Sequence, residues 1–194
     1  MSKPVLGLDF DDVIFAHNDA LFAFQNERDG TSFTRDDIMH YGLEKTWGCS
    51  REEAHTRVMR FFHSPDHFKT QPLPGSIEAV ELLERSYDIH LITARSAEFL
   101  SQTQEWLQHY LPILADRLYF TREVHGGESR PKSDVCKELG VSVFVDDALH
   151  HAEDLAPAVE RVFLLDTPWN QTEEALPANV KRVYSWEEIT RELV

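Results

Sequence analysis

The sequence predicts an α/β protein in which a doubly wound parallel sheet is interrupted by a helical insertion. Three observations support this fold class: short apolar runs alternate with segments of helical periodicity, the apolar runs end in polar residues, and residues 17–71 contain no convincing apolar run. Alternating strands and helices are typical of a parallel sheet with helices on both faces. Ligands of such sheets bind beyond the carboxyl ends of the strands, which is where the polar residues of this chain fall.

The expected strands are short and rich in β-branched or aliphatic side chains, as buried parallel strands are. They comprise residues 5–10, 88–94, 117–121, 141–147 and 161–166. Helical spacing is found between them, at residues 76–86, 96–110, 132–140 and 148–160. Ser76, Ser96 and Ser133 are suited to helix N-termini, and Gly140 is suited to a helix C-cap.

The insertion after the first strand is expected to be a small helical cap. Amphipathic pieces such as NDALFAFQNERDG and SREEAHTRVMRFF indicate helices. The segment FKTQPLPG then returns the chain to the core through a rigid Pro/Gly turn. We therefore expect a core domain of residues 1–16 and 72–194 and a cap of residues 17–71.

The composition excludes several classes of partner. The chain has 194 residues, 34 Asp and Glu against 19 Lys and Arg, and a formal net charge of −15, which argues against nucleic-acid binding because that depends on basic residues. Its two cysteines have no CxxC spacing, so they suit a reducing compartment and provide no disulfide framework. No apolar run resembles a signal peptide or approaches the roughly 20 residues of a membrane span. We expect a cytoplasmic protein without a membrane or nucleic-acid partner; its oligomeric state is not predicted.

Reactive side chains follow the expected strands in order. The set comprises Asp9 and Asp11, then Thr93, then Lys132 at the start of a helix, and then Asp146 and Asp147. Each of these residues alone has an ordinary explanation in a turn, a helix cap or a solvated surface. Their common position at strand ends or helix starts predicts that they meet in one site. Converging carboxylates without a cation would repel one another and raise their own pKa values, so the set also implies a cation.

The same motifs resemble those of the haloacid dehalogenase (HAD) superfamily of phosphotransferases. GLDFDDV is similar to the first motif of that superfamily, HLITA to the second, Lys132 in RPKSDVCKELG to the third, and VFVDDA to the fourth. The resemblance covers most of the chain and implies a HAD-type, Rossmann-like core with a C1 cap after the first strand. The segments LPGSIEAVELL, LITARS and VFVDDALHH resemble the 5'(3')-deoxyribonucleotidase-like group. Asp12 departs from the pattern, because many members have Gly there, and it receives no role.

The resemblance implies a phosphoric monoester hydrolase that acts through an aspartyl-phosphate. Asp9 would be the nucleophile, while Asp11 would protonate the leaving alkoxide and later deprotonate the attacking water. Mg²⁺ is the implied cofactor, and its implied ligands or supports are Asp9, the carbonyl of Asp11, Asp147 and Asp146. The pattern favours Asp147 as the direct ligand, although the sequence alone leaves that choice open. The implied phosphate-binding residues are Thr93, Ala94, Arg95 and Lys132, with an ion-pair role as the alternative for Arg95.

Substrate contacts from the cap side are harder to predict. Most cap aromatic residues are expected to form the small core of the cap. The candidates for substrate contact are Phe15, His17, Trp47 and Phe68. Trp169 is expected to pack its loop onto the core. His63 and His67 are four residues apart, but Pro65 between them disfavours a helical zinc pair.

The expected substrate is a (deoxy)nucleoside monophosphate, a small phosphorylated molecule. An alternative with the same chemistry is a sugar phosphate or another small phosphometabolite. A glycosyltransferase with a DxD motif would leave the positions of Thr93, Lys132 and the Asp146–Asp147 pair unexplained. A non-catalytic binding protein on this scaffold would be expected to lack the nucleophile or the general acid, and both are present.

Overall fold

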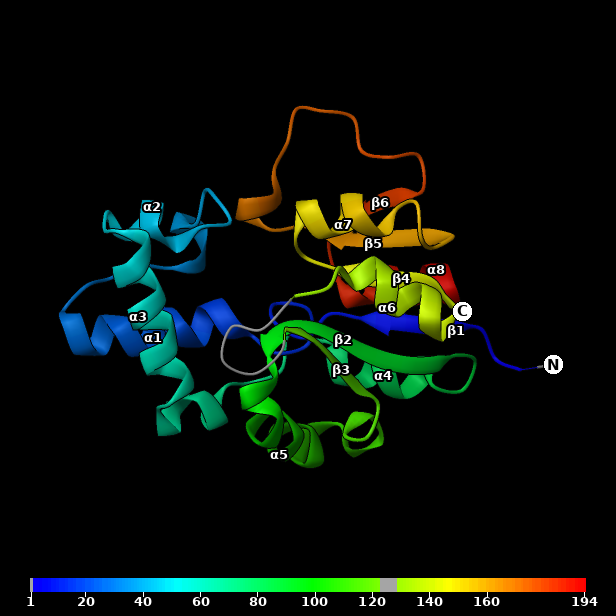
Figure 1. Ribbon diagram of the computed structural model, residues 1–194, viewed down its shortest axis with the longest axis horizontal. Helices are drawn as coiled ribbons and strands as arrows, with labels where there is room; N and C mark the ends of the chain where they lie inside the picture. The colour runs from blue at the N-terminus through cyan, green and yellow to red at the C-terminus, as the bar shows by residue number, and fades with distance from the viewer. Residues whose placement is uncertain (1, 123–128) are drawn as a thin grey trace.

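The computed structural model describes residues 2–122 and 129–194, and its core is a six-stranded parallel sheet (Figure 1). The strand order is β3-β2-β1-β4-β5-β6, and every neighbouring pair is parallel. The strands are β1 (Val5–Leu8), β2 (Asp88–Ser96), β3 (Leu118–Arg122), β4 (Val141–Asp146), β5 (Arg161–Leu165) and β6 (Val180–Val183). This order confirms the expected doubly wound α/β fold, whose direction of winding switches between β1 and β4.

Helices cover both faces of the sheet. One face packs against α4 (Ser76–Leu83), α5 (Leu100–Tyr110) and α8 (Trp186–Leu193), and the other packs against α6 (Lys132–Leu139) and α7 (Leu149–Leu155). Short 3-10 helices connect the elements: η3 (Ala97–Phe99), η4 (Pro112–Leu114) and η6 (Pro168–Asn170). Among the helices of the described residues, none is long and apolar enough to cross a membrane.

The sequence prediction missed β6 and α8 and misplaced several helix ends, among them the end of the helix expected over 76–86, which stops at Leu83. The β6 strand lies at the edge of the sheet, and its charged residues Lys181 and Arg182 interrupt the apolar pattern by which strands were recognised. The helix expected over 96–110 begins at Leu100, because β2 continues to Ser96 and η3 follows. The helix expected over 148–160 ends at Leu155, before a turn that leads into β5.

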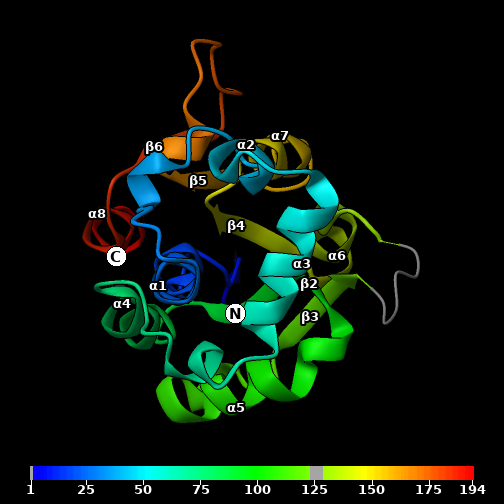
Figure 2. The ribbon, with the colours of Figure 1, turned by 90° about the vertical axis from the view of Figure 1, so that its left-hand side faces the viewer.

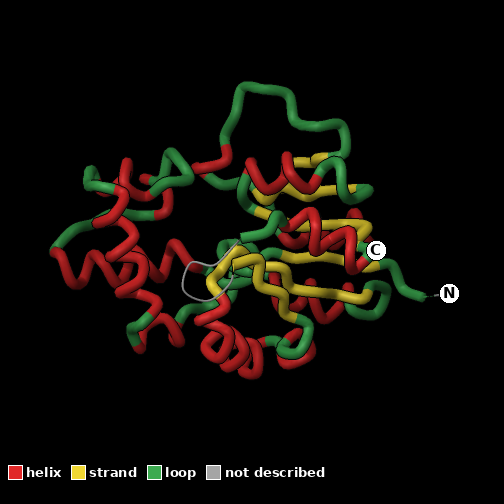
Figure 3. Tube along the Cα trace, in the orientation of Figure 1, coloured by secondary structure: helices red, strands yellow, loops and turns green. Residues whose placement is uncertain are grey.

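Residues 17–71 contain helices and loops and no strand (Figure 3). The helices are α1 (His17–Asp29), η1 (Arg35–Asp37), α2 (Leu43–Trp47), α3 (Arg51–Phe62) and η2 (Pro65–Lys69). They lie beyond the carboxyl ends of the strands, so the view from that end looks onto α1, α2 and α3 (Figures 1 and 2). They enclose a hydrophobic cluster of their own, made of Leu21, Phe22, Ile38, Trp47, Ala54 and Phe61 together with Trp169 from the sheet side. We call residues 17–71 the cap; the exact domain boundaries stay a prediction.

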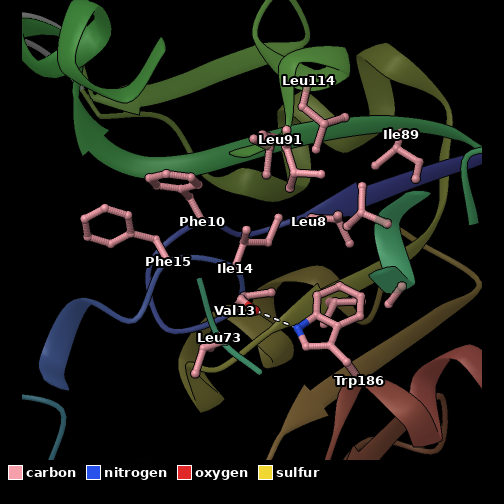
Figure 4. Packing of buried hydrophobic residues seen from close by; sticks show 14 of the residues in the cluster. Leu8, Phe10, Val13, Ile14, Phe15, Leu73, Ile89, Leu91, Leu114 and Trp186 are labelled. Carbon is pink, nitrogen blue, oxygen red and sulfur yellow. Dashed lines mark hydrogen bonds between the residues drawn. The ribbon is translucent and has the colours of Figure 1, made fainter. Parts of the chain in front are cut away.

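Trp186 fastens the C-terminal helix to the start of the chain. It is 2% exposed, and its indole N–H donates a hydrogen bond to the Val13 carbonyl oxygen at 2.7 Å (Figure 4). Val13 lies in the loop that follows β1, which is the loop that carries Asp9 and Asp11. The buried hydrogen bond therefore holds the predicted catalytic loop against α8.

Asp12 shapes the turn that leads from β1 to the cap. Its φ of 53° lies in the left-handed region, which Asp and Asn tolerate better than most residues. Its carboxylate accepts hydrogen bonds from the Asn18 main-chain N–H at 3.2 Å and from Asn18 Nδ2 at 2.6 Å. Burial raises the pKa of Asp12 to about 8, although Arg35 and the Asn18 N–H act in the opposite direction.

Replacing Trp186 with Phe is expected to lower the free energy of unfolding by about 1–3 kcal/mol, because the buried Val13 carbonyl loses its hydrogen-bond donor. Urea unfolding followed by circular dichroism measures the change. The matched control is Tyr184→Phe, since Tyr184 is 71% exposed and its substitution should change stability little. Equal stability of wild type and Trp186→Phe would contradict the assigned role.

Replacing Asp12 with Asn is expected to change the pH dependence of stability. A buried acid whose folded pKa lies above its unfolded value of 3.8 makes the folded state less stable as the pH rises from that value through about 8. Asn tolerates the same φ but carries no titrating proton. The unfolding free energy of Asp12→Asn minus that of wild type should therefore increase between about pH 5 and about pH 9, measured without metal. A pH-independent difference would count against a buried, raised-pKa carboxyl.

Candidate active site

The predicted site residues surround a cavity of about 750 Å³ between the carboxyl ends of the strands and the cap. From the sheet side it is lined by Asp9, Asp11, Thr93, Ala94 and Asp147, among others. From the cap side it is lined by His17, Asn18, Tyr41, Val58, Met59 and Phe62, among others. Residues that are far apart in the sequence thus meet because the ends of β1, β2 and β4 are neighbours in the sheet.

Lys132 joins two of the strand ends beneath this cavity. It is the first residue of α6 and is 2% exposed. Its Nζ lies 2.9 Å from Asp9 Oδ1 and 2.7 Å from Asp146 Oδ2. Burial alone would lower the pKa of Lys132, but the two carboxylates raise it above its ordinary value. The two carboxylates therefore favour the charged ammonium form of Lys132.

The two carboxylates that flank Lys132 differ in their electrostatics. Asp9 follows β1 and is 6% exposed; burial raises its pKa to about 6, even though Lys132 acts to lower it. Asp146 ends β4 and is fully buried. Burial would raise the pKa of Asp146, but Lys132 and His151 hold it below the ordinary range. Asp146 is thus the permanent counter-ion of Lys132, while Asp9 faces the cavity.

Among the residues that the structure describes, Asp147 has no cationic partner of this kind. It is 6% exposed, and one of its oxygens, Oδ2, accepts a hydrogen bond from Trp169 Nε1 at 2.7 Å. Burial and the neighbouring carboxylates Asp146, Asp12 and Asp9 raise the pKa of Asp147 well above its ordinary value. Buried like charges of this kind are stabilised by a cation, and an all-oxygen donor set suits Mg²⁺. The residues therefore fit a divalent cation on the Asp9–Asp147 side of the site.

A second arrangement of possible ligand atoms involves Asp9, Asp146 and His151, whose atoms lie within 4.8 Å of one another. Lys132 already contacts both of these carboxylates. A divalent ion among the same oxygens would lie next to a buried ammonium group, and like charges at that distance repel strongly. The geometry therefore favours the Asp9–Asp147 side.

Arg95 forms a bidentate ion pair with Asp11. Arg95 Nε lies 2.8 Å from Asp11 Oδ2, and Nη2 lies 2.5 Å from Oδ1. His17 Nδ1 is 3.5 Å from the same Oδ1. Burial would raise the pKa of Asp11, but Arg95 and His17 together lower it to about 2. In this structure Asp11 is therefore an ionised carboxylate.

The structure shows Arg95 in the ion pair that was its alternative role, and Arg95 also lines the cavity. Its main-chain N–H donates to Thr93 Oγ1 at 3.2 Å, and its Nη1 donates to Thr103 Oγ1 at 3.1 Å. Its guanidinium carbon lies 4.5 Å from the ring centroids of both Phe10 and Phe15. Arg95 is thus an ion-pair partner of Asp11 in this structure, and its phosphate-binding role stays a prediction. Thr93 and Ala94 line the cavity, as expected for phosphate-binding residues.

Of the four cap-side candidates, His17 lines the cavity, and the other three lie elsewhere. Phe15 is fully buried and stacks on Phe10 at a centroid distance of 5.1 Å. Trp47 is 9% exposed and meets Phe22 edge-on at 5.7 Å within the cap cluster. Phe68 is 38% exposed and contacts His67 at 5.9 Å, outside the cavity wall. Helical periodicity identifies a buried face, but it does not tell which neighbour covers that face.

Sequence reasoning missed two residues of the site, Tyr41 and Trp169. Tyr41 is 57% exposed but lines the cavity, and its ring meets that of His150 edge-on at a centroid distance of 4.5 Å. No pattern in the sequence distinguishes Tyr41 from other cap aromatics. Trp169 does follow a predicted strand closely, so the strand-end rule could have found it. Its indole contacts Asp147 and the cap cluster rather than only packing a loop.

Comparisons with known proteins agree with this architecture. A nucleotidase from Clostridium acetobutylicum is 26% identical over 163 residues, which cover 82% of this chain and 78% of that protein. A Bacillus cereus protein provisionally named a nucleotidase is 24% identical over 94% of both chains. A haloacid dehalogenase-like hydrolase from Streptococcus pneumoniae has the same fold, with a TM-score of 0.66, 14% identity and 99% coverage of both chains.

The family model for the 5' nucleotidase, deoxy (pyrimidine), cytosolic type C protein matches residues 3–194. This match includes the strand ends, the cap and the edge strand β6. The chain therefore belongs to this nucleotidase family and is a phosphoric monoester hydrolase, with the fold of haloacid dehalogenase-like hydrolases.

Proposed function

We propose that this protein is a Mg²⁺-dependent phosphatase that hydrolyses (deoxy)nucleoside monophosphates through an aspartyl-phosphate. The observation that supports this most directly is the ammonium group of Lys132 between Asp9 and Asp146, at the base of a cavity that also meets Asp11, Thr93 and Asp147. Phosphoryl transfer depends mainly on positioning and on neutralising negative charge, and this arrangement supplies both.

In the first half of the reaction, an oxygen of Asp9 attacks the phosphorus atom of the substrate. The new O–P bond forms as the bond to the ester oxygen breaks, and Asp11 gives a proton to that oxygen. In the second half, Asp11 takes a proton from water, which attacks the phosphorus and releases Asp9. The Thr93 hydroxyl already accepts from the Arg95 N–H, so its hydrogen is free to donate to a phosphoryl oxygen.

The proton that Asp11 donates requires a change in its pairing with Arg95. While both oxygens of Asp11 accept from the guanidinium, its pKa of about 2 keeps it ionised. An incoming phosphate dianion raises the proton affinity of nearby carboxylates and attracts the guanidinium. We infer that substrate binding weakens the Arg95–Asp11 pair and that Asp11 then takes up a proton from the solvent.

Asp9, the Asp11 carbonyl and Asp147 would hold the cation, and Asp146 would remain the partner of Lys132. When bound, Mg²⁺ neutralises negative charge on the phosphoryl oxygens and reduces their repulsion of Asp9. A HAD hydrolase from Bacillus subtilis with a TM-score of 0.63 to this chain was crystallised with bound magnesium.

The cap side of the cavity is consistent with a nucleoside. Ile38, Leu43, Val58, Met59 and Phe62 supply an apolar wall opposite the acids, against which a flat base can pack. The family and the relatives described above are nucleotidases. A sugar phosphate would leave this wall exposed to water, which disfavours the alternative substrate class.

Replacing Asp9 with Asn is expected to reduce turnover about 10³-fold or more, because the amide is a poor nucleophile, while the fold is retained. Phosphate release from a nucleoside monophosphate in saturating Mg²⁺ measures the effect, and circular dichroism checks the fold. Retained turnover would contradict the assignment of Asp9.

Asp11→Asn is the companion variant to Asp9→Asn. It keeps the nucleophile, so with a substrate whose leaving group needs no proton it should accumulate the aspartyl-phosphate, detectable by mass spectrometry as a phosphate adduct on Asp9. An adduct on another residue would contradict the proposed chemistry.

A panel of phosphomonoesters, each assayed with Mg²⁺ and with a chelator, tests the substrate class. We expect nucleoside monophosphates to be hydrolysed with the highest kcat/KM, sugar phosphates poorly, and neither substrate without the metal. Preferred turnover of sugar phosphates would overturn the nucleotide assignment while leaving the phosphatase chemistry in place.

A further inference from the structure

Trp169 connects two parts of the molecule that the catalytic motifs do not join. It lies in η6, a few residues after the carboxyl end of β5, and is 8% exposed. Its indole N–H donates a hydrogen bond to Asp147 Oδ2 at 2.7 Å. Asp147 lines the cavity, so this bond leaves its other oxygen, Oδ1, available to a cation.

The segment that carries Trp169 is fixed firmly to the sheet. Its neighbour Asn170 is 1% exposed and donates through Nδ2 to the main-chain oxygens of Asp147 and Leu165, each at 2.7 Å. Arg182 on β6 donates to Asn170 Oδ1 at 2.5 Å. Asp147 is therefore held at its main chain by Asn170 and at its carboxylate by Trp169. Two hydrogen bonds from one turn leave the carboxylate little freedom to rotate.

The ring of the same tryptophan packs against the cap. It completes the hydrophobic cluster that Leu21, Phe22, Ile38 and others form within residues 17–71. The guanidinium carbon of Arg35, on η1 of the cap, lies 4.9 Å from the centroid of the Trp169 ring. A movement of the cap away from the sheet would break these ring contacts and would free the indole to turn.

We propose that Trp169 is a positioning residue that orients Asp147 for the divalent cation and couples that orientation to the position of the cap against the sheet. This inference rests on the cation site of the proposed function. Its physical basis is that one rigid side chain makes a directional hydrogen bond with its N–H and packs its ring against a different domain. Residues that orient metal ligands commonly contribute 10–100-fold, roughly, to metal affinity.

The first test is direct measurement of Mg²⁺ binding to the full chain by isothermal titration calorimetry, in the absence of substrate. Trp169→Phe keeps an aromatic ring in the cap cluster and removes the N–H. We expect the Kd for Mg²⁺ to rise about tenfold or more. Unchanged affinity would overturn the positioning role.

A matched control separates this effect from a loss of stability. Trp106→Phe also removes a buried indole N–H that donates to a main-chain oxygen, in this case that of Thr70, which has no part in the proposed cation site. It should lower the unfolding free energy without changing the affinity for Mg²⁺. Equal weakening of Mg²⁺ binding in both variants would show that general loosening is the cause, and would overturn the proposal.

The cap side of the proposal is tested with Arg35→Lys. This change keeps the positive charge near the acids and removes the planar group that lies over the indole. We expect the Kd for Mg²⁺ to rise about twofold or more in the wild-type background and to stay unchanged in Trp169→Phe, because the effect passes through the indole N–H. The same fold-change in both backgrounds would show that Arg35 acts independently, and would overturn the coupling.

Asp147→Asn distinguishes failure of this inference from failure of the proposed function. If Asp147 holds the cation, this variant should lose most of the Mg²⁺ affinity. Unchanged affinity in Asp147→Asn would refute the cation site itself, and with it the inference. Lost affinity in Asp147→Asn together with wild-type affinity in Trp169→Phe would refute only the role of Trp169.

Discussion

The contact on which the site depends is the buried ammonium group of Lys132 between Asp9 and Asp146. Buried charges are costly unless they are paired, and three carboxylates at the ends of β1 and β4 are at most 6% exposed: Asp9, Asp146 and Asp147. The strand order brings these ends together, and α6 starts at the position that brings Lys132 beneath them. The Lys132 ammonium thus makes the convergence of the acids possible, while Asp147 has no cationic partner in the part of the chain that the structure describes.

The cap also supplies hydrogen-bond and electrostatic partners to the acids that follow the strands. Asn18 donates two hydrogen bonds to Asp12, and Arg35 acts electrostatically on Asp12 and lies over the Trp169 ring. Trp169 in turn donates to Asp147. The cap is therefore linked to the acids at the carboxyl ends of β1 and β4, and it also forms one wall of the cavity. Under the proposed function, the cap would in this way also influence how the cation is held.

The Arg95–Asp11 pair was not predictable from the motif that contains Arg95. LITARS places Arg95 two residues after Thr93, where a phosphate contact is a natural expectation. The side chain turns to Asp11 and Thr103, and its guanidinium lies against the stacked rings of Phe10 and Phe15. Similarly, Trp47 fills the core of the cap, while Tyr41, which no pattern singled out, lines the cavity.

The sequence by itself determined the fold class, five of the strands, the helical nature of the insertion and the convergence of Asp9, Asp11, Thr93, Lys132, Asp146 and Asp147. These follow from local periodicity and from the rule that parallel strands end at one edge, which are properties that short stretches of chain carry. Tertiary structure alone decided that Lys132 pairs with Asp9 and Asp146. It also decided that Arg95 pairs with Asp11 and that Trp169 links Asp147 to the cap. The physical reason is that the partner of a side chain depends on how segments that are distant in the sequence pack together. One sequence pattern of buried residues is compatible with several different partners until that packing is formed.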